Sequence, residues 1–390
     1  MNLSSLSLLR FFFALWLVSA EAHGAVQYQP APEGSRLEIV NHEQVKNVIL
    51  LIGDGMSVAT VSAARFRGAG IHGRLHMDRM PVAGFMQTCS ADRLITDSAA
   101  ASTALASGFK TNNSIIGRTP QQENVVTIME AAQARGMSAG LVATSAITHA
   151  TPAGFAAHAF ARSDQSEIAL WLLKNRIDVL LGGGLAFFFP DKGKRTDERN
   201  LLQEAAEVGY EVLTQREQLL QSSSPRLLGL FADDGMTTHA PEPTLAEMTS
   251  RALAALNKNS QGFMLMVEGS QIDWANHRND LEDAIEQTLA FDSAVREALD
   301  FAQSDGSTLV VVTADHETGG MALVGGGPDA STLEAAWTTK GHTAGTVPLY
   351  AYGPGALHFS GFHDNTELPV LMARLLKIEN FPRQQRSVAD

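Results

Sequence analysis

The residues best suited to chemistry stand where short apolar runs of this 390-residue chain end. They combine carboxylates, hydroxyls and imidazoles, and they are Asp54, His149 with Thr151, Glu268 with Asp273 and His277, Asp315 with His316, and His342 shortly before the last apolar run. Such groups bind divalent metals, the imidazole-rich part favouring zinc and the oxygen-only part magnesium. Because ligands collect at the carboxyl ends of strands in α/β sheets, we predict one metal cluster there.

Spacing within two of these groups supports shared metal binding. Asp273 and His277 are four residues apart, so on a helix they share one face and can grip one ion. Asp315 and His316 are adjacent and converge only in a bent loop, which the following Glu-Thr-Gly-Gly at 317–320 permits. Taken singly, a strand-end aspartate is most often a helix cap, and a lone histidine is a core or surface residue. The remaining histidines are assigned to that plain class: His42, His72, His76, His158, His239, His358 and His363.

A candidate nucleophile stands in the stretch Thr-Asp-Ser-Ala-Ala-Ala-Ser-Thr-Ala at 96–104. Ser98 precedes a run of small residues with good helix propensity, which places it at or near a helix N-terminus, where an anion is favoured. Most serines there are only caps, and Ser98 becomes a nucleophile if the metal cluster surrounds it. It is not part of a Gly-x-Ser-x-Gly elbow, which disfavours an ordinary Ser-His-Asp hydrolase.

The elements that must position these residues alternate along the chain. Strands are expected at 48–52, 82–88, 139–143, 179–181, 227–231, 263–267, 308–312 and 347–352. Helices are expected at 58–66, from 98 onward, and at 124–135, 152–162, 166–174, 244–257 and 281–302, with a glycine-rich loop at 325–327. This alternation predicts an α/β fold with a doubly wound, mostly parallel central sheet and helices on both faces.

Composition limits the function classes. An apolar fraction of 45% and a charged fraction of 18% are typical of a globular protein with a sizeable core. A formal charge of −13 with no basic run argues against a nucleic-acid-binding surface. The same charge repels phosphate, so phosphate chemistry needs local positive charge such as metal ions. The single cysteine excludes an intramolecular disulfide.

The first residues predict export. Arg10 precedes an apolar run at 11–18 that is too short to span a bilayer, and small residues allow cleavage after Ala20 or Ala22. We expect a signal peptide at 1–22, an N-terminal arm at 23–44 and one catalytic domain at 45–390 with an elaboration around 185–226. No later stretch is long enough for a membrane span, so the mature protein is expected to be soluble and periplasmic or extracellular.

Six motifs carry a resemblance. They are Gly-Asp-Gly-Met at 53–56, Asp-Ser-Ala-Ala at 97–100, Thr151-Pro152 with Arg162, Val-Glu-Gly at 267–269 with Asp273 and His277, Thr-Ala-Asp-His-Glu at 313–317, and Gly-His-Thr at 341–343. In type and order they resemble the alkaline phosphatase family, over residues 53 to 343. Any one motif is weak, whereas six in order are very specific.

The resemblance implies two zinc ions and one magnesium ion. Asp273, His277 and His342 match the ligands of the first zinc. Asp54, Asp315 and His316 match those of the second, with the Ser98 oxygen facing it. Asp54 would also bridge to a magnesium ion held by Thr151 and Glu268.

The resemblance also implies the reaction. The family hydrolyses phosphate monoesters with low specificity at alkaline pH through a phosphoserine, here on Ser98, and Arg162 matches the arginine that grips the phosphoryl oxygens. We expect Asp97 to orient Arg162 or cap the helix rather than act as a base. A homodimer is implied by resemblance alone.

Two positions depart from the best-known bacterial pattern. His149 stands where an aspartate is common, so zinc or cobalt could compete with magnesium at the third site. Trp274 stands where a lysine or histidine is common. Because tryptophan carries no charge, we hypothesise that product phosphate is held less tightly and leaves faster.

Three other functions fit these residues less well. A phosphodiesterase of the same superfamily is disfavoured by Arg162, which needs non-bridging oxygens free of a second ester. A sulfatase would need a modified Cys or Ser in its own motif, which is absent. A secreted metal- or phosphate-binding protein without turnover would have no need of the Ser98 hydroxyl.

Overall fold

A computed structural model describes residues 27–190 and 194–385, so the predicted signal peptide lies outside the described residues. Its centre is a ten-stranded sheet. In spatial order the strands are β14 (Gly361–Asp364), β2 (Val82–Gln87), β13 (Val347–Tyr352), β8 (Thr308–Thr313), β1 (Asn47–Gly53), β7 (Phe263–Gly269), β3 (Ser138–Ala146), β4 (Val179–Gly183), β6 (Leu227–Leu230) and β5 (Glu211–Leu213). Neighbouring strands are parallel except around β13, which runs antiparallel to both β2 and β8. The predicted mostly parallel sheet is confirmed.

The sheet is buried from both sides. All seven residues of β1 are buried, as expected for a continuous apolar run in a parallel sheet whose two faces are covered. Each buried Val, Leu or Ile stabilises the fold by about 1.5–3 kcal/mol relative to its exposed state. The register pairs Ile52 with Glu268 on one side and with Thr313 on the other, so the carboxylates that follow or end these strands meet at one edge.

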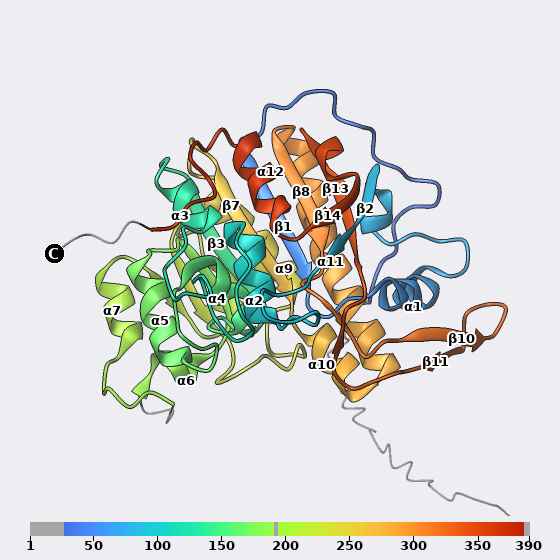
Figure 1. Ribbon diagram of the computed structural model, residues 1–390, viewed down its shortest axis with the longest axis horizontal. Helices are drawn as coiled ribbons and strands as arrows, with labels where there is room; N and C mark the ends of the chain where they lie inside the picture. Colours follow the sequence, from blue (N-terminus) through green and yellow to red (C-terminus); the bar gives the residue numbers. More distant parts are fainter. Residues whose placement is uncertain (1–26, 191–193, 386–390) are drawn as a thin grey trace, which may run out of the picture.

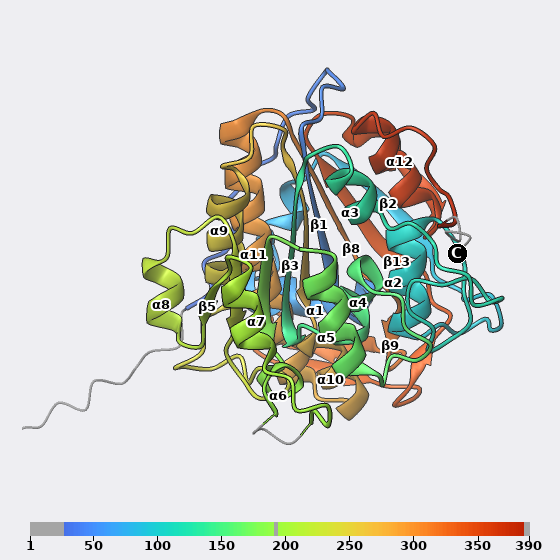
Figure 2. The same cartoon turned by 90° about the vertical axis from the view of Figure 1, so that its left-hand side faces the viewer.

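Helices form a layer on each face of the sheet (Figure 2). One layer contains α1 (Val58–Ala69), α9 (Leu245–Leu256) and α11 (Leu281–Asp305), in which α1 and α9 both pack on α11. The other contains α2 (Ser98–Ser107), α3 (Ile128–Gln133), α4 (Ala150–Ala156) and α12 (Glu367–Leu375). The doubly wound architecture predicted from the alternation is therefore confirmed. Among the described residues, no helix is long and apolar enough to cross a membrane.

Local sequence explains where the layer helices begin and end. α9 starts at a capping box, in which the Thr244 hydroxyl accepts from Glu247 N–H and the Glu247 carboxylate accepts from Thr244 N–H. α11 starts where Asp280 accepts from Asp283 N–H, and it ends at Gly306 in the left-handed conformation at φ 72°. These caps satisfy backbone groups that the first and last turns leave free.

Two predicted helices are shorter than expected. The helix expected at 152–162 is α4 and ends at Ala156, because residues 157–159 turn back to pair with the 116–117 segment. There the His158 ring bonds to the Gly117 carbonyl and to Glu130. The helix expected at 124–135 is α3 and starts only after Thr127, whose side chain caps it. Arg162 consequently lies on a loop and not on a helix.

Two other segments are more ordered than predicted. The stretch 185–226, expected as an elaboration of the domain, forms α6 (Leu185–Phe188), α7 (Leu201–Glu207) and α8 (Arg216–Gln221). It also supplies β5, which extends the main sheet. The glycine-rich loop expected at 325–327 instead overlaps β10 (Ala322–Gly326), which forms a hairpin with β11 (Leu333–Ala336). Figure 1 shows this hairpin projecting from the body of the molecule beside α1.

Candidate active site

The candidate site lies at the carboxyl edge of the parallel strands, as predicted. Asp54 follows β1, Asp315 follows β8, and Glu268 is the next-to-last residue of β7. All three side chains are fully buried. They share one edge because the strand register aligns the ends of β1, β7 and β8.

The predicted ligand residues converge in three groups of side chains. Within each group the ligand atoms lie within 4.8 Å of one another, and the groups are Asp273, His277 and His342; Asp54, Asp315 and His316; and Asp54, His149 and Glu268. Asp273 and His277 sit on one face of α10 (Gln271–Arg278), as their spacing predicts. Asp54 belongs to two groups, so its two oxygens can serve neighbouring ions.

Six polar atoms of these groups and of the adjacent Thr151 are shielded from solvent and have no hydrogen-bond partner. They are both carboxylate oxygens of Asp54, Asp315 Oδ2, Glu268 Oε1, Thr151 Oγ1 and His149 Nδ1. Each unpaired buried group costs about 1–3 kcal/mol. Acceptors left open together fit divalent cations, because a cation would pair with several of them at once.

The pKa values of three of the carboxyl groups are raised, as expected for buried carboxylates without cations beside them. Burial first, and then the charge of Asp315, raises the pKa of Asp54 well above its usual value. Burial likewise raises the pKa of Glu268 to about 7 and that of Asp315 to about 6. Burial also raises the pKa of Asp273, but hydrogen bonding to His277 and the charges of nearby imidazoles outweigh it and hold the value below the usual range.

Two of the imidazoles, those of His316 and His149, favour the neutral form that can bind a metal, whereas the hydrogen bond to Asp273 raises the pKa of His277. Burial, followed by the charge of His342, lowers the pKa of His316 well below its ordinary value. Burial and then Arg162 lower the pKa of His149 to about 4. The Nδ1 atoms of His277 and His342 bond to the carbonyls of Lys340 and Thr96, leaving their Nε2 atoms 3.2 Å apart at the cluster. Metal-binding histidines are commonly oriented by such contacts.

Ser98 lies against the second group. It is the first residue of α2, and Asp97 is the cap, accepting from Ala100 N–H at 3.0 Å. The Ser98 hydroxyl is 3.2 Å from His316 Nε2, and that nitrogen is 3.4 Å from Asp54 Oδ1. Ser98 is only 2% exposed, so the hydroxyl faces the cluster and not bulk solvent.

Arg162 is aimed at the same place by two contacts. Its guanidinium donates to Asp97 Oδ2 at 3.2 Å and lies 3.2 Å from His149 Nε2. Asp97 therefore both caps α2 and orients Arg162, where the sequence left a choice between the two. Trp274 stands nearby with its ring edge-on to His149, at 6.1 Å between centroids.

Sequence reasoning missed two residues that hold the site. Ser114 has φ 74°, and in this conformation its N–H donates to Asp97 Oδ2 while its carbonyl accepts from Arg162 N–H. Thr318 donates its hydroxyl to Asp273 Oδ1 at 2.6 Å and contacts His316 Nδ1 at 3.2 Å. The Asn-Asn-Ser turn at 112–114 was a detectable signal for the first, whereas nothing in the sequence distinguished Thr318.

The chain as a whole is similar to known alkaline phosphatases. A family model described as "Alkaline phosphatase" matches residues 45–331 and 326–378, in two overlapping segments. Alkaline phosphatase 3 of Bacillus subtilis is 36% identical, over 90% of this chain and 94% of its own. Alkaline phosphatase of Escherichia coli K12 is 31% identical, over 87% of this chain and 88% of its own.

Solved structures with the same fold have related sequences. The alkaline phosphatase of the Antarctic bacterium TAB5 superposes with a TM-score of 0.79 at 34% identity, over 87% of this chain and 100% of its own. The Thermus thermophilus enzyme gives a TM-score of 0.81 at 26% identity, over 94% of this chain and 97% of its own.

Proposed function

The chain belongs to the alkaline phosphatase family and is a phosphoric monoester hydrolase, and from that premise we propose that it acts through a phosphoserine on Ser98. The observation that carries the proposal is the position of the Ser98 hydroxyl, 3.2 Å from His316 and beside carboxylate oxygens that lack partners. The substrates in this proposal are small phosphate monoesters, hydrolysed with low specificity at alkaline pH.

The three groups would hold two zinc ions and one magnesium ion. The first zinc is assigned to Asp273, His277 and His342, the second to Asp54, Asp315 and His316, and the magnesium to Asp54, Thr151 and Glu268. When bound, the cations supply positive charge that favours the serine alkoxide and offsets charge on the phosphoryl group. Protons compete less for histidine and carboxylate ligands as pH rises, which supports an alkaline optimum.

His149 is the feature of the third group that bears on which metal is bound there. Its imidazole lies with Asp54 and Glu268, so the third group includes a nitrogen ligand. A histidine-to-aspartate mutant of the TAB5 enzyme was solved with Mg bound in its M3 site. We assign magnesium to this chain and expect metal analysis of a His149→Asp variant to show a higher Mg-to-Zn ratio than the unmodified protein.

The chain's own groups perform the covalent steps. Arg162 binds two non-bridging phosphoryl oxygens through its planar guanidinium, which Asp97 orients. Ser98 Oγ forms a bond to phosphorus while the bond to the ester oxygen breaks, and the alcohol leaves. Water then attacks the phosphoserine, which releases phosphate and restores the Ser98 hydroxyl.

Export and assembly belong to the same proposal. Residues 1–22 form the signal that directs the protein to the periplasm or outside the cell, and residues 45–390 form one catalytic domain after an N-terminal arm at 23–44. The protein works as a homodimer, as the family resemblance implies.

Hydrolysis of p-nitrophenyl phosphate by the unmodified protein and by Ser98→Ala, with and without chelator, tests the function. We expect chelator-sensitive hydrolysis that is lost in the variant, and phosphate trapped on Ser98 when the enzyme is acid-quenched at mildly acidic pH. Metal binding without turnover would indicate a binding protein. Activity that resists the chelator, or label on another residue, would overturn the mechanism.

A further inference from the structure

A cavity opens directly beside Ser98. It has a volume of about 690 Å³ and is lined by Arg93, Leu94, Ile95, Thr96, Asp97, Asn113 and His342. Asp97 is adjacent to Ser98 in sequence, and the His342 ring stacks on His316 at 3.6 Å between centroids. The cavity therefore shares two walls with the site where the phosphoryl group is bound.

Its outer wall is apolar although it faces solvent. Leu94 is 74% exposed and Ile95 is 44% exposed. Single exposed apolar residues are common on protein surfaces, but two in succession beside a catalytic site form a surface that a ligand can cover.

The loop that presents these side chains is tied down. The Asn113 side chain donates to the Ile95 carbonyl at 3.1 Å and accepts from Asp97 N–H at 3.2 Å. Asn113 N–H donates to Asp92 Oδ1 at 3.0 Å, and Ser90 N–H donates to the Arg93 carbonyl. The exposure of Leu94 and Ile95 is thus fixed by the hydrogen bonds on either side of them.

We propose that Leu94 and Ile95 form a leaving-group shelf that favours phosphate monoesters of apolar alcohols, an inference that rests on the proposed function. Ser98 is buried, so the alcohol part of a bound ester must extend from the phosphoryl site toward solvent. In an in-line displacement this part lies opposite the attacking oxygen. His342 belongs both to the cavity wall and to the group of Asp273, His277 and His342, so the cavity adjoins that group.

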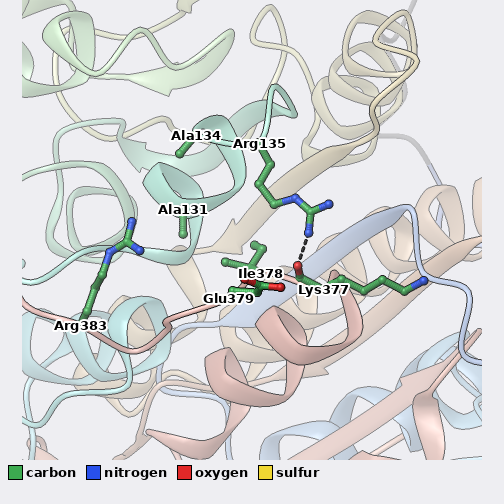
Figure 3. Close-up of a pocket in the computed structure, with 7 residues that line it drawn as sticks. All are labelled: Ala131, Ala134, Arg135, Lys377, Ile378, Glu379 and Arg383. Carbon is green, nitrogen blue, oxygen red and sulfur yellow. Dashed lines mark hydrogen bonds between the residues drawn. The ribbon is translucent and has the colours of Figure 1, made fainter.

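Another cavity with charged residues in its wall lies at the opposite end of the parallel strands, before the start of β3, and its charges do not converge. It has a volume of about 450 Å³ and is lined by Arg135, Lys377, Glu379 and Arg383 among others. Figure 3 shows the Lys377 side chain extending away from Arg383, while Arg135 donates to the Lys377 carbonyl. We therefore assign no anion site there.

Two esters of primary alcohols, ethyl phosphate and hexyl phosphate, separate apolar contact from leaving-group chemistry. We expect kcat/KM to be at least about fourfold higher for the hexyl ester, the factor for one buried methylene group. Leu94→Asn should bring the hexyl-to-ethyl ratio to about one. The control is Leu357→Asn, which changes another exposed leucine, 54% exposed and outside the cavity, and should leave the ratio intact.

Binding supplies a second readout. Hexylphosphonate should bind more tightly than ethylphosphonate in calorimetry, and Leu94→Asn should remove the difference. A ratio near one in the unmodified protein, or a ratio that Leu94→Asn leaves unchanged, would overturn the shelf. Failure to hydrolyse either ester would instead overturn the proposed function, and the shelf with it.

Discussion

Strand β1 begins at the buried Asn47 and is followed by the buried Asp54. The two side chains differ in whether they have hydrogen-bond partners. At the amino end, the Asn47 amide donates to Thr308 Oγ1 at 3.0 Å and to Asp305, and its carbonyl oxygen accepts from Phe263 N–H. At the carboxyl end, neither oxygen of Asp54 has a hydrogen-bond partner. Both side chains are fully buried, so burial alone does not distinguish them.

The difference shows where the fold leaves buried polar atoms unpaired, at a cost in stability. Buried polar groups in native proteins are nearly always paired, and Asn47 follows that rule. Asp54 breaks it together with Glu268 and Asp315, all at one edge of the sheet. Departures of this kind mark sites where function outweighs stability. At the amino end of β1 the buried polar side chain is paired within the protein, whereas at the carboxyl end the unpaired acceptors belong to the proposed metal site.

Replacing Asp54 should produce the largest effect. Asp54→Asn removes a carboxylate shared by two groups, and we expect kcat/KM for p-nitrophenyl phosphate to fall by about 10²- to 10³-fold, as for other single losses of charge stabilisation. Metal analysis should show fewer bound ions per chain. Full activity with the full metal content would show that Asp54 is not part of the cluster.

The same substitution should change stability in the other direction when metals are removed. The pKa of Asp54 is higher in the folded state than in the unfolded state. Its contribution to folded-state stability is therefore fully present below the unfolded pKa and is lost as the pH rises through the folded pKa. In chelator, Asp54→Asn should therefore unfold at higher denaturant than the unmodified protein at pH 8. The gap should shrink as pH falls toward 4. Denaturant titrations across this range measure it, and a gap that widens on acidification would contradict the argument.

Replacing Asn47 tests the opposite end of the strand. Asn47→Ala leaves the buried Phe263 N–H without its acceptor and removes one donor to the Thr308 hydroxyl, which keeps its bond to Asp305. We therefore expect a loss of about 1–3 kcal/mol in the free energy of unfolding. Activity per folded molecule should not change. If Asn47→Ala lowered activity but not stability, the division of β1 into a structural end and a functional end would be wrong.

Much of this contrast could be predicted from the sequence. The apolar runs that become β1, β7 and β8 are long enough to be recognised as buried strands, and each is followed or ended by a carboxylate. Because parallel strands align their carboxyl ends, the meeting of Asp54, Glu268 and Asp315 followed without knowledge of the loops.

Contacts between distant segments could not be predicted in the same way. Residues 157–162 have a composition compatible with helix, yet pairing with 116–117 and the bonds of the buried His158 end α4 at Ala156. Ser114 adopts a left-handed conformation without being a glycine, since it serves Asp97 and Arg162 at once. Such choices are made by tertiary structure, which outweighs local propensity.

The smallest effect that we predict concerns Trp274 and the affinity of the site for phosphate. Trp274 packs edge-on to His149 and brings no charge to the site. Trp274→Lys should add one positive charge near the phosphoryl group, and a single charge pair in a solvated site contributes about 1 kcal/mol, or about fivefold in affinity. Inhibition by inorganic phosphate should tighten by about that factor, and kcat should fall if release limits turnover.

Trp274→Phe is the matched control, because it keeps an aromatic ring without a charge and should leave phosphate inhibition near its original value. Unchanged inhibition in Trp274→Lys would mean that the residue at position 274 does not set the affinity for product phosphate. That affinity would then depend on Arg162 and the carboxylate groups.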